Sequence, residues 1–295
     1  MPRPPQVSVQ LIKYPLLFAP ILLLASCDKV DDPLGDGEGP VNPGTAVPRR
    51  VLLEDCTGML CNNCPQAAEI AEELKGIYGD RLIVVAVHMV DGFAAPQAPL
   101  NDGLFDTDFR TPAGAAYEQA FNILSLPKGL VSRAPYENAV GLSRTKWSSA
   151  VAALIDQEAD FELWFDNLDF NAGTNTVTTT VKAVCTKAIS GDHNLTIYLT
   201  EDSIIDDQLN LEVEPPPVEN YVHRHVLRDN LNGTWGEAIL TGSASAGDTL
   251  SLSYTYTLSA NVLQPNNCAL VAYVHPASGP DARVVKQVVE AQLVP

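Results

Sequence analysis

The sequence predicts an α/β domain followed by an all-β sandwich, and three observations support this prediction. Between residues 51 and 88, two apolar segments of strand length flank a segment whose apolar residues have helical spacing. From residue 161 onward, short segments alternate apolar and polar residues at period two, which is typical of antiparallel strands. The chain has 295 residues, the length of about two domains.

The α/β domain is expected over residues 49–160. Its elements are expected to follow one another as strand, helix, strand, strand and helix over residues 51–53, 65–78, 81–88, 126–133 and 143–156. The third of these segments is apolar almost throughout, as in a strand buried on both faces of a parallel sheet. The stretch between residues 91 and 125 is expected to be irregular and partly helical.

The all-β domain is expected over residues 161–295, and its pattern resembles an immunoglobulin-like sandwich. The alternating segments lie at residues 161–165, 177–184, 195–199, 250–256, 269–274 and 284–289. Cys185 ends the second of them and Cys268 opens the fifth. In immunoglobulin domains the strands in these positions face each other and are often bridged. Two interpretations stay open, a Cys185–Cys268 disulfide and two separate buried thiols.

The N-terminus has the features of an exported lipoprotein. Arg3 and Lys13 precede an apolar run over residues 14–24, which is too short to span a bilayer. The run ends in Leu-Ala-Ser-Cys, which resembles the lipobox of bacterial lipoprotein precursors. This resemblance implies a signal peptide over residues 1–26 and acylation of Cys27; the alternative is an ordinary signal peptide with an incidental cysteine.

Composition limits the partners. Residues 27–48 are rich in Gly, Pro and Asp and are expected to form a flexible tether. The formal net charge of −18 repels nucleic acid and anionic lipid. The expected partners are therefore exported protein thiols and disulfides, with the membrane reached through the lipid anchor and no nucleic acid bound. Export also places the cysteines in an oxidising compartment, where disulfides persist.

Cys61 and Cys64 form a CxxC motif between the first expected strand and the first expected helix. A helix N-terminus stabilises a thiolate, so Cys61 is expected to be the exposed nucleophile and Cys64 the resolving thiol. The alternative is a permanent structural disulfide. Zinc would need two further ligands, which no second CxxC provides, and His223 and His225 are interpreted as a polar pair on one strand face. Neither a metal nor a cofactor is expected.

Three further residues match a thioredoxin-like domain, in which CxxC lies at such a strand–helix junction. In thioredoxins an acidic residue at the position of Asp55 lies beneath the disulfide and moves the proton of the resolving thiol, and a cis-proline at the position of Pro127 packs against the CxxC. His88 ends the second strand, and parallel strands end at the same edge of a sheet, which places His88 on the CxxC side. Alternatively, Asp55 caps a turn and His88 is a hydrogen-bonded core residue.

A series of motifs resembles the twenty-eight-kilodalton outer-membrane protein family of Bacteroidetes lipoproteins. The motifs begin at Val51 (VLLEDCTG), Cys61 (CNNCP), Val85 (VAVHM), Leu126 (LPKGLVSR) and Tyr221 (YVHRHVLR). The resemblance implies an outer-membrane lipoprotein with a thioredoxin-like domain, facing the periplasm or the surface. The function expected is thiol–disulfide exchange on exported proteins. The alternative is a non-enzymatic adhesin or assembly protein in which the disulfide only braces the fold.

Overall fold

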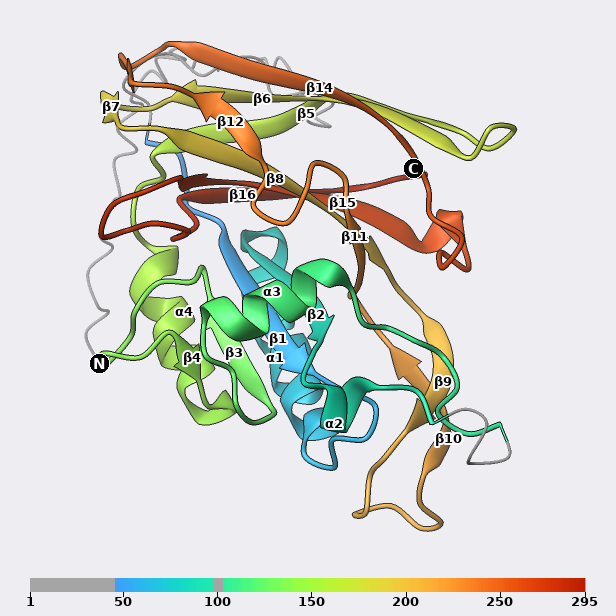
Figure 1. Ribbon diagram of the computed structural model, residues 1–295. Coiled ribbons are helices and arrows are strands. Elements are labelled where there is room, and N and C mark those ends of the chain that lie inside the picture. The colour runs from blue at the N-terminus through green and yellow to red at the C-terminus, as the bar shows by residue number, and fades with distance from the viewer. Residues whose placement is uncertain (1–45, 98–102, 295) are drawn as a thin grey trace, which may run out of the picture. The chain divides into compact units, whose positions relative to one another are not determined.

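The computed structural model describes residues 46–97 and 103–294 (Figure 1), and all of these lie in one compact unit, Pro40–Pro295. The expected signal peptide, the lipidation site Cys27 and most of the expected tether lie outside the described residues. Among the described residues, no helix is long and apolar enough to cross a membrane.

A nine-stranded mixed sheet forms the centre of the unit. Eight strands follow in the order β16-β15-β8-β11-β2-β1-β3-β4, and β12 pairs with β8. Their bounds are β1 Val51–Thr57, β2 Leu82–His88, β3 Lys128–Val131, β4 Gly141–Leu142, β8 His193–Glu201, β11 Val226–Asn230, β12 Glu237–Leu240, β15 Cys268–Pro276 and β16 Gln287–Gln292. Strands β1 and β2 are parallel, whereas β1 and β3 are antiparallel.

The prediction of a thioredoxin-like α/β domain followed by a separate immunoglobulin-like sandwich was wrong. The main sheet contains strands from both sides of residue 160, because β11 lies beside β2. The two strands join through one parallel pair, Val226 with Ala86, and the Ala86 N–H donates to the His225 carbonyl oxygen at 2.8 Å. Strands make up 42% and helices 19% of the described residues, so the α/β part is the smaller part of one mostly β fold.

A second, smaller sheet supplies the other β layer. Strands β5 (Phe161–Asn171), β6 (Thr176–Cys185) and β14 (Thr249–Thr257) form an antiparallel sheet in the order β14-β6-β5. Two short two-stranded pairs stand apart from both sheets. They are β9 (Ile204–Gln208) with β10 (Val218–His223), and β7 (Ile189–Ser190) with β13 (Ser243–Ala244).

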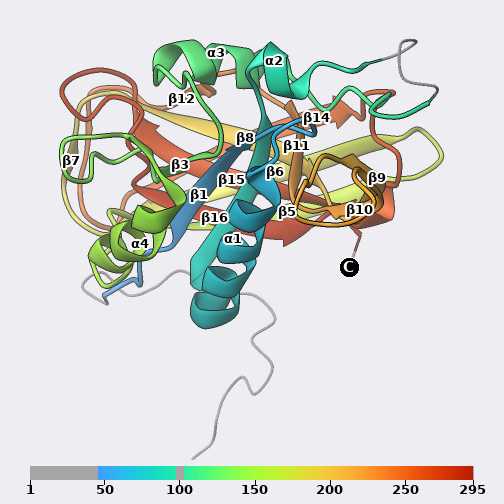
Figure 2. The same ribbon diagram turned by 90° about the horizontal axis from the view of Figure 1, so that it is seen from below.

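The helices cover the two faces of the main sheet, as Figure 2 shows. Helices α1 (Cys64–Tyr78) and α4 (Trp147–Ile155) lie on one face, while α2 (Asp91–Ala94) and α3 (Pro112–Ala120) lie on the other. Because successive strand residues point to opposite faces, Val51 and Leu53 pack under α1 and α4, whereas Leu52 packs towards α3. The three-stranded sheet packs on β8 and β15 in a separate hydrophobic core.

Cys185 and Cys268 are both buried and neither forms a disulfide within the described residues. Cys185 pairs with Phe161, whose ring lies against His193 at the first residue of β8. Cys268 instead pairs with Glu201, the last residue of β8. A strand rises about 3.3 Å per residue, so the two cysteines lie near opposite ends of a nine-residue strand. A disulfide needs Cα atoms within about 7 Å, and the alternative of two separate thiols holds.

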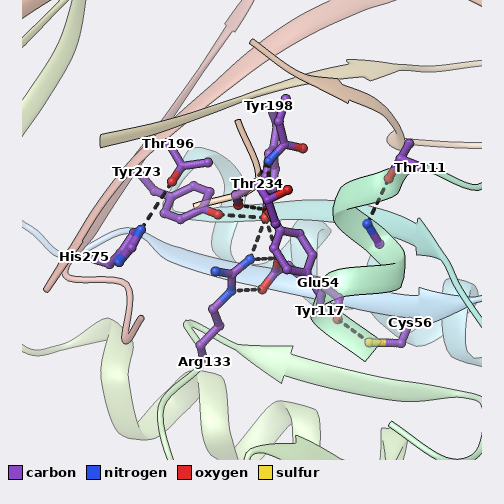
Figure 3. Close-up of polar contacts among 12 residues, drawn as sticks. Glu54, Cys56, Thr111, Tyr117, Arg133, Thr196, Tyr198, Thr234, Tyr273 and His275 are labelled. Carbon is purple, nitrogen blue, oxygen red and sulfur yellow. Dashed lines mark hydrogen bonds and ion pairs between the residues drawn. The ribbon is translucent and has the colours of Figure 1, made fainter. Parts of the chain in front are cut away.

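An ion pair between Glu54 and Arg133 lies in the main sheet's interior, with both side chains 0% exposed (Figure 3). Arg133 donates to both carboxylate oxygens of Glu54, at 2.7 and 2.8 Å. The hydroxyl of Tyr198 donates to Glu54 at 2.7 Å and accepts from the hydroxyl of Tyr273 at 2.8 Å. Burial opposes the charge of Arg133, but the adjacent Glu54 holds its pKa above the usual value. The cluster connects β1 and the loop after β3 to β8 and β15.

Breaking this pair should destabilise the protein strongly. Glu54→Gln leaves the Arg133 charge buried without its counter-ion, and such changes cost about 3–5 kcal/mol. Denaturant unfolding should show this loss of unfolding free energy. Glu137→Gln, which breaks the exposed pair with Lys146, should leave the unfolding free energy equal to that of wild type within experimental error. If Glu54→Gln does not fold, Tyr198→Phe removes one hydrogen bond from the same carboxylate and should cost about 1–2 kcal/mol. Equal stability of Glu54→Gln and Glu137→Gln would contradict this role.

Candidate functional site

The disulfide between Cys61 and Cys64 lies where β1 leads into α1. The Cα atoms are 5.4 Å apart, and the Cys64 N–H donates to the Cys61 carbonyl oxygen at 3.1 Å. Helix α1 begins at Cys64 itself, with Pro65 in its first turn, where the missing N–H costs little. Both cysteines are only 2% exposed, so the prediction that Cys61 is the more exposed thiol was wrong for this disulfide state.

The β9–β10 hairpin, residues 204–223, covers the disulfide. The side-chain amide of Gln208 donates to the carbonyl oxygens of Gly58 at 3.4 Å and Cys61 at 3.2 Å. The Leu209 N–H donates to the Met59 carbonyl oxygen at 2.8 Å. The Leu211 N–H donates to the Asn62 side chain, between the two cysteines, at 2.6 Å. These contacts attach the end of β9 and the turn after it to residues 58–62, which form the CxxC loop.

A cavity of about 450 Å³ lies between α1, the ends of β1 and β2, and β10. Asp55, Cys64 and His88 all line it. Strand alternation brings them together: Asp55 and His88 lie on the α1 face of adjacent parallel strands, where Asp55 pairs with Ala86 and Thr57 with His88. The lining residues that the sequence did not indicate include Gln208, Tyr221 and Glu72.

Asp55 is a buried acid with an incomplete set of hydrogen bonds. It is 3% exposed, and its Oδ1 atom has no hydrogen-bond partner among the described residues. Burial raises the pKa of the Asp55 carboxyl to about 7, because a low-dielectric site disfavours the charged form. The side chain therefore exchanges its proton near neutral pH, which suits a proton donor or acceptor.

His88 lines the same cavity and belongs to an aromatic cluster. Its ring centroid is 4.8 Å from Phe109 and 5.8 Å from His223, and Nδ1 has no hydrogen-bond partner in the described part of the chain. Burial lowers the pKa of His88 well below its usual value and lowers that of His223 to about 4. Both imidazoles are therefore neutral at neutral pH.

His223 and His225 do not share a strand face as expected. Strand β10 ends at His223, and His225 follows in the left-handed region with φ 51°. The His223 ring contacts the Asp207 carbonyl oxygen at 3.2 Å, whereas His225 lies between Glu72 and Asp202, at 3.0 and 3.2 Å. Within the described residues, no group of three His, Cys, Asp or Glu side chains could hold a metal ion.

Pro127 and Cys56 lie outside the cavity lining. The Leu126–Pro127 peptide bond is cis and precedes β3, in which Lys128 pairs with Cys56 of β1. Cys56 is a buried free thiol whose pKa burial raises well above its usual value. The structure thus brings together Cys64, Asp55 and His88 in one cavity, but does not bring Pro127 into it.

Comparison with known proteins assigns the family. The family described as Outer membrane protein Omp28 matches residues 114–293, more than half of the chain, and the chain belongs to this family. Membership locates the protein at the outer membrane or in the cell envelope. The matched residues begin after the disulfide, Asp55 and His88, so the family assignment does not itself describe the cavity. No curated protein matches the chain.

Two solved structures resemble the fold. HBP35 of Porphyromonas gingivalis is 17% identical with a TM-score of 0.61, over 84% of this chain and 76% of that one. Protein AGR_C_4864 from Agrobacterium tumefaciens is 11% identical with a TM-score of 0.50, over 84% of this chain and 96% of that one. At these identities the likeness concerns the fold alone.

Replacing Asp55 should change how stability depends on pH. The folded pKa of Asp55, about 7, lies above its ordinary value of 3.8, so its contribution is fully present below about pH 4 and is lost as pH rises through 7. Asp55→Asn removes this loss. The stability of Asp55→Asn relative to wild type should rise between pH 4 and 7, by on the order of 4 kcal/mol at most, and then stay level.

The measurement is denaturant unfolding of both proteins at several pH values. The difference between them is needed because His88 and His223, with lowered pKa values, destabilise the fold as pH falls. Asp80→Asn, at an exposed position, is the control for the substitution itself. A difference between wild type and Asp55→Asn that is constant from pH 4 to 7 would show that Asp55 does not titrate as described.

Proposed function

We propose that this outer-membrane protein catalyses thiol–disulfide exchange on exported proteins and is anchored through acylated Cys27. Cys61 is the nucleophile and Cys64 the resolving thiol. The observation that carries the proposal is Asp55, a buried carboxyl with a free oxygen and a pKa of about 7, in the same cavity as Cys64. A disulfide that only braced the fold would gain nothing from such an acid, whose burial opposes folding once it ionises.

Starting from the Cys61–Cys64 disulfide, the protein oxidises two substrate thiols. A substrate thiolate attacks Cys61 Sγ, which breaks the Cys61–Cys64 bond and forms a mixed disulfide. The leaving Cys64 thiolate takes the proton of Asp55. A second substrate thiolate then attacks the substrate sulfur of the mixed disulfide and releases the Cys61 thiolate. The substrate is oxidised to a disulfide, and the Cys61 thiolate and the ionised Asp55 take up protons from water to give the reduced dithiol protein. The reverse sequence reduces a substrate disulfide.

Exchange requires movement of the β9–β10 hairpin. A substrate thiolate must approach the sulfur of Cys61 in line with the disulfide bond, but Cys61 is only 2% exposed. The contacts of the hairpin with the CxxC loop are hydrogen bonds from Gln208, Leu209 and Leu211, and Ile204 and Leu209 also pack against Met59. Each hydrogen bond is worth only about 0.5–1.5 kcal/mol net, so opening of the hairpin is within the range of local unfolding.

The burial of both cysteines also favours a second candidate function, a non-enzymatic adhesin or assembly protein with a structural disulfide. That function predicts a bridge that resists reduction and does not react with substrate thiols. It assigns no role to the unpartnered Asp55 oxygen. The two candidates differ in one observable, the covalent capture of a substrate through Cys61.

Substituting the resolving thiol should trap substrate. Cys64→Ser keeps the Cys61 thiol, which attacks a substrate disulfide. The resulting mixed disulfide persists, because no Cys64 thiol remains to break it. Incubation with insulin as a disulfide-containing probe should give a mixed disulfide on a non-reducing gel, whereas Cys61→Ser should give little. Gln208→Ala in the Cys64→Ser protein should speed trapping, because it releases the hairpin from the Cys61 carbonyl oxygen.

The matched control is Cys185→Ser in the Cys64→Ser protein, since Cys185 is a buried thiol away from the cavity. It should leave the yield unchanged. Absence of any Cys61-linked product from folded Cys64→Ser and from its Gln208→Ala derivative would exclude exchange and leave the structural disulfide.

A further inference from the structure

The β9–β10 hairpin has two unlike faces. Its inner face carries Ile204, Gln208 and His223, which are at most 4% exposed. On its outer face Ile205 pairs directly with Val222 across the strands, so their side chains are neighbours. These two are 66% and 39% exposed. Figure 1 shows the hairpin extending beyond the end of the main sheet.

Exposed apolar side chains concentrate on this element. The described residues include eight large hydrophobic side chains that are exposed, and four of them, Ile205, Leu211, Val213 and Val222, lie within residues 204–223. Leu211 lies beside the disulfide, because its backbone N–H donates to the side chain of Asn62 within the CxxC motif. A concentration of this kind marks an interaction site more often than isolated exposed residues do.

The charge of the hairpin selects the partner. Residues 204–223 contain no Lys or Arg and four acidic residues that are at least partly exposed, Asp206, Glu212, Glu214 and Glu219; a fifth, Asp207, is buried. Along the cavity next to it, Glu69, Glu72 and Glu73 of α1 outnumber the one Arg in the lining, Arg224. This surface attracts a cationic partner and repels anionic lipid. The net charge of −18 also opposes pairing with a second copy of this chain.

We propose that the outer face of the β9–β10 hairpin binds extended polypeptide segments that are both apolar and basic, and presents them to the disulfide. Such segments are exposed by proteins that have not yet folded. The proposal rests on the proposed function for the role of the disulfide, but the binding itself needs no redox chemistry. A segment bound on the outer face would therefore contact the same hairpin whose inner face covers Cys61.

Three labelled, unstructured peptides without cysteine test the proposal by fluorescence anisotropy with the full-length protein. One contains Leu, Val and Lys, the second replaces Lys with Glu, and the third replaces Leu and Val with Ser. The first should bind at least about tenfold more tightly than either of the others, because the second peptide is repelled by the acidic hairpin and the third cannot bury apolar side chains. Added salt should weaken its binding.

The variants Ile205→Ser and Val222→Ser should each weaken binding of the first peptide about tenfold, on the same scale. Ile77→Ser and Leu263→Ser, which remove exposed apolar side chains elsewhere, are matched controls and should not. Equal binding of all three peptides, or no effect of the hairpin variants, would overturn the proposal. So would hairpin-dependent binding to phosphatidylcholine vesicles in place of peptide.

The outcomes separate this proposal from the exchange activity. Peptide binding without trapping through Cys61 would support the docking surface and contradict the exchange activity. Trapping through Cys61 without selective peptide binding would support the exchange activity and contradict the docking surface.

Discussion

Glu54 and Arg133 form the buried ion pair on which the continuity of the main sheet depends. Glu54 lies in β1, between β2 and β3 of the sheet, and Tyr198 of β8 donates to the same carboxylate. The Arg133 guanidinium also lies 4.4 Å from the ring centroid of Tyr117 in α3. A charge buried this deeply is tolerated only with its partner in place, so the cluster specifies how the β-rich part packs on the α/β part and makes the two a single unit.

The candidate site results from this continuity. Strand β11 joins β2 at one residue pair only, Val226 with Ala86. Before that pair the chain forms the β9–β10 hairpin, and after it β11 pairs with β8. This arrangement leaves the cavity beside α1 and places the hairpin over the CxxC loop. The candidate cavity, the hairpin that contacts the CxxC loop and the exposed apolar side chains of that hairpin therefore all lie where the two halves of the chain meet.

Local features of the fold could be predicted from the sequence, but the arrangement of its strands could not. Apolar spacing and Gly79 located α1, and the βαβ order put Asp55 and His88 on neighbouring strands, because these signals act within about 30 residues. The pairing of β11 with β2 joins residues 140 apart, and neither strand's pattern indicates its neighbour. The cover over Cys61 was missed for the same reason: Gln208 contacts it from 147 residues away.

The reduction potential of the Cys61–Cys64 disulfide tests the central claim most directly. It is measured by equilibrating the folded protein with glutathione buffers and quantifying the two thiols by alkylation and mass spectrometry. The account predicts a potential above about −300 mV, in the range of disulfides that exchange with substrates. A value below about −300 mV, as structural disulfides have, would contradict it and identify the disulfide as a brace for the fold.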